Sequence, residues 1–176
     1  MLWWCQSVNQ PPPSPSEPFG SRSEVFEGYL DYFRARIVDG VESLPERELY
    51  ESRLASGWTP LQLLKHLRYV ELRWLEWGFE GRVVEGPWGD HEGRHWFVEK
   101  TETRRVLIEA LEAQATRSRF IIESNDLTTV GQPGPRWEGE APPTLERILF
   151  HVLQGYARHS GHLDIVCELV NGAPKP

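Results

Sequence analysis

Four stretches of this chain repeat apolar side chains at the spacing of an α-helix, so each predicted helix has one apolar face. We place them at about residues 21–44, 59–79, 103–124 and 144–170. No run of useful length alternates polar and apolar residues as a half-buried strand does. Four long amphipathic helices in one small domain pack against each other as a bundle. The sequence therefore predicts an all-α fold, a four-helix bundle.

Local signals at the ends of these stretches support the helix boundaries. Thr59 and Gln62 have the spacing of a capping box, in which each side chain bonds the other residue's backbone N–H. Thr144 is expected to cap the last helix. The pair Asn171-Gly172 is common where a helix ends.

The first 20 residues differ from the rest, because five prolines lie between Ser and Asn residues. Proline removes a hydrogen-bond donor and blocks helix formation, so residues 1–20 are predicted to be an extended arm. Residues 21–176 then form the helical domain. Trp3 and Trp4 lie at the tip of the arm. Two interpretations stay open: a disordered extension, or an arm that packs onto a neighbouring subunit and gives a homodimer.

The charge balance excludes some functions. The chain has 19 Lys and Arg against 26 Asp and Glu, a formal net charge of −7, and no basic cluster that would bind nucleic acid. No stretch has the roughly 20 apolar residues that a membrane span needs. Cys5 and Cys167 make no disulfide framework, and the start does not have the pattern of a signal peptide. We expect a cytoplasmic protein that binds neither nucleic acid nor membrane.

Three of the six histidines fall on predicted apolar faces. His66 lies three residues after Leu63 and four before Val70, on the same side of its helix. His159 lies within the apolar stripe of the last helix, and His162 follows one turn later. Imidazoles at this i, i+3 spacing can reach one metal ion, and three protein ligands with an open position are typical of catalytic zinc. A hydrogen-bonded core histidine is the competing interpretation for each.

Other candidate residues keep two interpretations each. His91 and His95 lie in a glycine-rich loop that is either solvated or a lid over the site. Glu71 and Asp164 follow the histidines closely, and are either solvated or hold a ligand imidazole in one tautomer. Gly155 costs helix stability, which indicates either close packing of a neighbour over its backbone or a gap for substrate.

The motifs around these histidines are familiar. They comprise GWTP at 57–60 and LKHL at 64–67, with FHVL at 150–153 and YARHSGH at 156–162. Over about residues 22–174 the chain resembles the DinB-like superfamily, and within it the mini-circle-protein branch.

The resemblance implies a DinB/YfiT-like four-helix bundle that holds a divalent metal through histidines. His66 and His159 match two of the family's ligand positions, but the third position, four residues before His159, is Gly155 here. Either His162 replaces the missing ligand or the site is lost. Relatives include the metal-binding domain of mycothiol-dependent maleylpyruvate isomerase.

The resemblance also implies the chemistry. The leading hypothesis is a transferase or isomerase that uses Zn²⁺ or Ni²⁺, held by His66, His159 and His162, with mycothiol or another small thiol and a small-molecule substrate. The competing hypothesis is a metal-free, non-catalytic bundle that binds a small apolar ligand or a partner protein.

Overall fold

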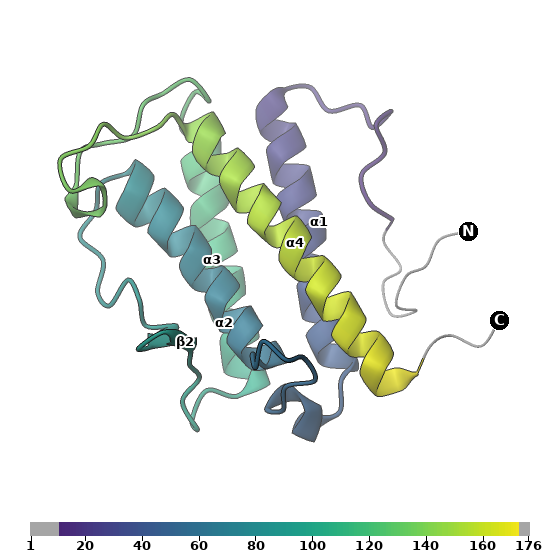
Figure 1. Cartoon of the computed structure of the whole chain (residues 1–176). Helices are drawn as coiled ribbons and strands as arrows, with labels where there is room; N and C mark the ends of the chain where they lie inside the picture. The colour runs from purple at the N-terminus through teal and green to yellow at the C-terminus, as the bar shows by residue number, and fades with distance from the viewer. Residues whose placement is uncertain (1–10, 173–176) are drawn as a thin grey trace.

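A computed structural model describes residues 11–172 of the chain. It contains four long helices, as the sequence predicts, together with short helical turns and one two-stranded hairpin (Figure 1). The elements in chain order are α1 (Arg22–Ser43), η1 (Glu46–Leu49), α2 (Pro60–Glu71), η2 (Leu72–Phe79), β1 (His91–Glu92), β2 (His95–Trp96), α3 (Arg104–Glu123), η3 (Pro135–Trp137) and α4 (Leu145–Asn171).

The helix ends follow the local signals in the sequence with one exception. The Thr59 side chain accepts from the backbone N–H of Gln62, whose own side chain accepts from the Thr59 N–H, so the predicted capping box is present. Gly172 ends α4 with a positive φ of 78°, a conformation that glycine adopts without strain. Thr144 precedes α4 as predicted, but its side chain makes no capping hydrogen bond.

The second predicted helix changes its winding partway along. After Glu71 the segment η2 continues with wider turns, and the N–H of Glu80 bonds the carbonyl of Leu75, five residues back. Because of this wider winding, the side chains of η2, among them Arg73 and Trp74, point in other directions than they would on a continuous α-helix. The helical stretch still ends at Phe79, as predicted.

Each helix has one parallel neighbour, which the side-chain pairs establish. Ion pairs join Lys65 of α2 to Glu102, just before α3, and Glu80, just after η2, to Arg117, so residue numbers rise together along both helices. In the same way Arg22 of α1 pairs with Glu146 of α4, and Arg36 with Asp164. A long connection over 80–103 returns the chain to the end where α2 began (Figure 1).

One buried polar cluster crosses the apolar core. Glu71 of α2 is fully buried and accepts two hydrogen bonds from Arg34 of α1, at 2.9 and 2.8 Å. Ser118 of α3 and Tyr156 of α4 also donate to its carboxylate. Each of the four long helices therefore contributes one member, and every charge in the cluster has a partner.

The described part of the arm lies against α1. The ring of Phe19 covers Gly28, where an added Cβ would come within 2.7 Å of it. The Tyr29 hydroxyl donates to the carbonyl of Pro13 at 3.1 Å. Trp3, Trp4 and Cys5 lie outside the described residues. In the part of the chain that is described, no helix has the length and apolar character that crossing a membrane requires.

Candidate metal centre

The three predicted ligand residues come from two facing helices. The rings of His66, on α2, and His159, on α4, lie with centroids 5.2 Å apart and nearly perpendicular planes. His162 lies one turn further along α4, with its ring centroid 5.8 Å from that of His159. The helical spacing therefore places the ring of His159 next to the rings of both His66 and His162.

A buried carboxylate orients His66. Asp90, in the loop before β1, is completely buried, and its Oδ2 lies 2.9 Å from His66 Nδ1. Both terminal nitrogens of Arg73 donate to the same carboxylate. Burial favours the neutral acid, but the hydrogen bonds from His66 and Arg73 outweigh it and hold the pKa of Asp90 well below its usual range. An ionised Asp90 accepts a hydrogen bond from the Nδ1–H of His66, and this tautomer leaves Nε2 with a free lone pair.

The other two rings carry unsatisfied nitrogen atoms. Nδ1 of His159 and Nδ1 of His162 are both buried and have no hydrogen-bond partner. Burial, followed by the neighbouring His66 and His162, lowers the pKa of His159 to about 4. Burial also lowers the pKa of His66. At neutral pH His66 and His159 are therefore uncharged, the state in which imidazole binds a metal ion. A buried polar atom without a partner is costly, so this donor set fits a divalent cation.

A second ligand group overlaps the first. Among residues 11–172, one set of three metal-binding side chains places a ligand atom of each within 4.8 Å of the others, and it consists of His66, Asp90 and His91. The predicted trio can share one ion only after its side chains rotate. Because both Asp90 oxygens already accept hydrogen bonds from Arg73 or His66, we interpret Asp90 as the residue that orients His66.

Sequence reasoning missed Asp90. Its only signal is its place in the glycine-rich loop, directly before His91, and nothing in the helical periodicity of α2 indicates that this loop folds back onto His66. The two acids that were considered for this role lie elsewhere. Glu71 binds Arg34 in the core, and Asp164 pairs with Arg36.

Aromatic side chains enclose the histidines. Trp96 of β2 stacks on His66, with ring centroids 4.0 Å apart, and lies 5.5 Å from His159. Trp58 lies 6.3 Å from His162. The loop therefore covers the site, as the lid interpretation of this segment predicted, although through Trp96 and His91 rather than His95, which is exposed.

A cavity of about 350 Å³ opens beside His66 and His159. Gly155 lines it, and a Cβ added to Gly155 would meet no atom within 4 Å. The interpretation of Gly155 as a close-packing position is therefore wrong. The space beside Gly155 is open, as the alternative interpretation requires, and its use by a substrate stays a prediction. His151 also lines the cavity, with its ring 4.3 Å from that of Trp74.

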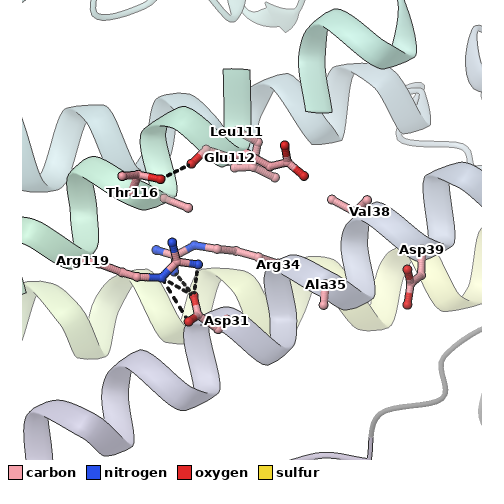
Figure 2. Close-up of a pocket in the computed structure, with 10 residues that line it drawn as sticks. Asp31, Arg34, Ala35, Val38, Asp39, Leu111, Glu112, Thr116 and Arg119 are labelled. Atoms are coloured by element: carbon pink, nitrogen blue, oxygen red, sulfur yellow. Dashed lines mark hydrogen bonds and ion pairs between the residues drawn. The ribbon is translucent and has the colours of Figure 1, made fainter. Parts of the chain in front are cut away.

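A second cavity, of about 460 Å³, lies between α1 and α3 (Figure 2). At one end Arg34 and Arg119 converge on Asp31, which accepts hydrogen bonds from both. No histidine or cysteine is among the described residues that line it. Of these two cavities, the one beside His66 and His159 is therefore the one with imidazole ligands.

Comparison with known proteins identifies the family. The family model described as mycothiol S-transferase matches residues 25–172, which span all four long helices and the three histidines. A search of curated proteins found no match. The chain therefore belongs to the mycothiol S-transferase family, a group of DinB-like four-helix proteins.

Proposed function

We propose that this protein is a metal-dependent transferase that joins the sulfur of mycothiol to a small electrophilic substrate. His66, His159 and His162 would hold the metal, with Zn²⁺ or Ni²⁺ as the candidate ions. The observation that carries the proposal is the set of buried, unpartnered Nδ1 atoms of His159 and His162 beside a His66 whose Nδ1 is taken by Asp90.

Each residue has a distinct role in this proposal. Asp90 accepts a hydrogen bond from the Nδ1–H of His66. This bond holds the proton on Nδ1 and so directs the Nε2 of His66 toward the ion. His162 supplies the ligand that Gly155 does not, and Gly155 leaves space for substrate beside His159. When bound, a divalent ion supplies Lewis acidity that favours the thiolate of the co-substrate, the nucleophilic form of a thiol. Trp96 excludes water from the stacked His66 ring.

The reaction class follows from this chemistry. A carbon–sulfur bond forms at the electrophilic carbon, the bond to the leaving group breaks, and the thiol proton passes to solvent. An isomerase, in which the thiol adds and leaves again, uses the same residues. We place the protein in the cytoplasm, where small thiols are kept reduced.

Metal content tests the site directly. Untagged protein, purified without chelating resin, is expected to carry close to one transition metal per chain by plasma mass spectrometry. His159→Ala is expected to lose most of that metal, because the central ligand is gone. His95→Ala is the matched control, since His95 is exposed on β2. Stoichiometric metal in His159→Ala would overturn the ligand assignment.

Thiol transfer tests the reaction. Mycothiol and 1-chloro-2,4-dinitrobenzene are incubated with the protein, and formation of the thioether is followed by absorbance. We expect the rate to fall after dialysis against a chelator and to recover with Zn²⁺ or Ni²⁺, and to be lower with N-acetylcysteine. A chain that stays metal-free and inactive after both ions are added would favour the metal-free binding bundle instead.

A further inference from the structure

The cavity beside His159 has an unbalanced charge. Three of its lining residues are arginines, Arg73, Arg136 and Arg158, and within the described part of the chain no Asp or Glu lines it. Arg73 is neutralised, because it is buried and donates two hydrogen bonds to Asp90. The other two arginines have no ion-pair partner among residues 11–172.

Arg136 is held in place by aromatic rings and not by an acid. Its guanidinium lies 4.2 Å from the ring centroid of Trp74 and 5.6 Å from that of Trp137. Its Nε is buried and has no hydrogen-bond partner. Burial, followed by the charge of Arg73, lowers the pKa of Arg136.

The rest of the cavity lining includes aromatic and aliphatic side chains. Trp74 and Trp88 line it with Val70, and the space next to Gly155 is open. Arg158 directly precedes His159 on α4 and is exposed, so its flexible side chain can reach an anion at the cavity opening. A cavity of about 350 Å³ is in the range of small-molecule sites.

We propose that this cavity binds an organic anion, a planar apolar compound that carries a carboxylate, with Arg136 and Arg158 as the residues that recognise the carboxylate. This assignment of the substrate class rests on the proposed function, since it is the electrophile of the thiol transfer that would bind here. Guanidinium groups bind carboxylates through paired, charge-assisted hydrogen bonds, and the free Nε of Arg136 is a donor that such a ligand would satisfy.

A pair of isosteric probes tests the proposal. Naphthalene-2-carboxylate and naphthalene-2-carboxamide have the same shape and differ in charge. We expect calorimetric titration of the full chain to give about tenfold tighter binding of the carboxylate, the size of one charge-assisted hydrogen bond. Arg136→Gln and Arg158→Gln should each reduce that preference to about twofold or less. Arg105→Gln, which removes an exposed charge on α3 paired only with Glu109, should leave it unchanged.

The same titrations on zinc-loaded and chelator-treated protein separate this proposal from the metal assignment. Carboxylate preference that persists in both forms supports the arginine site, even if metal and thiol transfer are absent. Preference seen only with zinc assigns the anion to the ion and overturns the proposal. Equal binding of the two probes, or an unchanged preference in both arginine variants, overturns it as well.

Inorganic phosphate is titrated alongside, and tighter binding of phosphate than of the carboxylate would contradict the apolar part of the assignment. Arg158→Gln changes an exposed residue, so it keeps the test valid if Arg136→Gln does not fold.

Discussion

Among residues 11–172, the carboxylates of Asp90 and Glu71 have no exposed surface, and they have different roles. Asp90 accepts from His66 and Arg73 beside the cavity, whereas Glu71 accepts from Arg34 within the core. A buried charge is tolerated only when partners surround it. The partners of Glu71 all lie on helices, while Asp90 lies on a loop and joins that loop to the histidine site.

Replacing Asp90 with Asn should weaken the site without removing a ligand. The amide keeps the shape but leaves Arg73 with an uncompensated charge and no longer fixes the Nδ1 proton of His66. We expect metal affinity to fall roughly 10–100-fold and the free energy of unfolding to fall by about 3 kcal/mol. Competition with a chromogenic chelator measures the first and urea unfolding the second.

Asp126→Asn is the control for that experiment, because Asp126 is exposed on the loop after α3. Equal metal affinity in Asp90→Asn and the native chain would mean that Asp90 only holds its loop in place and does not orient His66 for metal binding.

Helical periodicity was sufficient to place the histidines but not their partner. His66, His159 and His162 lie on inward faces because apolar neighbours at three and four residues fix those faces locally. Asp90 reaches His66 only after the connection over 80–103 folds back, and that depends on contacts far apart in sequence.

At the scale of helices, the Glu71 cluster determines how the four long elements align. One side chain from each helix must meet at a single carboxylate: Arg34, Glu71, Ser118 and Tyr156. A shift of one helix by a turn would leave a charge or a hydroxyl buried without a partner. The cluster therefore selects one alignment among those that the apolar faces alone would allow.

The contribution of this cluster to the free energy of unfolding should depend on pH, and the variant Tyr156→Phe tests this. Burial, and next the charge of Glu71, raise the pKa of Tyr156 well above 10.0, so the hydroxyl stabilises the fold below pH 10 and this contribution is lost as pH rises further. At pH 8 we expect the variant to unfold about 2 kcal/mol more easily, the value of a hydrogen bond to a charged group.

Above pH 10 the difference between native chain and Tyr156→Phe should shrink. Urea unfolding at pH 8 and pH 11 measures it, with Tyr50→Phe, which removes an exposed hydroxyl, as the control. A difference that stays constant with pH would contradict the role given to Tyr156.

The helix boundaries were predictable because capping is local, as Thr59 and Gln62 demonstrate. The wider winding of η2 was not, because its sequence is as apolar as that of an ordinary helix and only the packed neighbours distinguish the two. The absence of a capping bond at Thr144 has a similar cause: its backbone bridges to Val130, so the surrounding loop sets the start of α4.

At the scale of the whole molecule, the N-terminal arm is the segment that we expect to contact a second copy of the chain. Residues 11–20 lie on α1 through Phe19 and Pro13, whereas Trp3 and Trp4 precede the described residues. Two adjacent tryptophans at the tip of a proline-rich segment favour contact with another chain.

Deleting residues 1–10 tests that idea and leaves the contacts of Phe19 and Pro13 with α1 intact. We expect the full chain to have the mass of a homodimer in light scattering, and the shortened chain the mass of a monomer. Trp3→Ser combined with Trp4→Ser should act like the deletion. Equal masses for all three proteins would rule out a role of the arm in self-association.

The parallel pairing of α1 with α4 has a consequence for synthesis on the ribosome. The apolar face of the first helix is completed by the last one, and Gly40 of α1 approaches Leu163 so closely that an added Cβ would lie 2.7 Å from its side chain. A growing chain therefore cannot close its core until α4 has left the exit tunnel. Until then α1 and α2 expose surfaces that attract chaperones or other nascent chains, so folding yield should depend on how fast the last helix emerges.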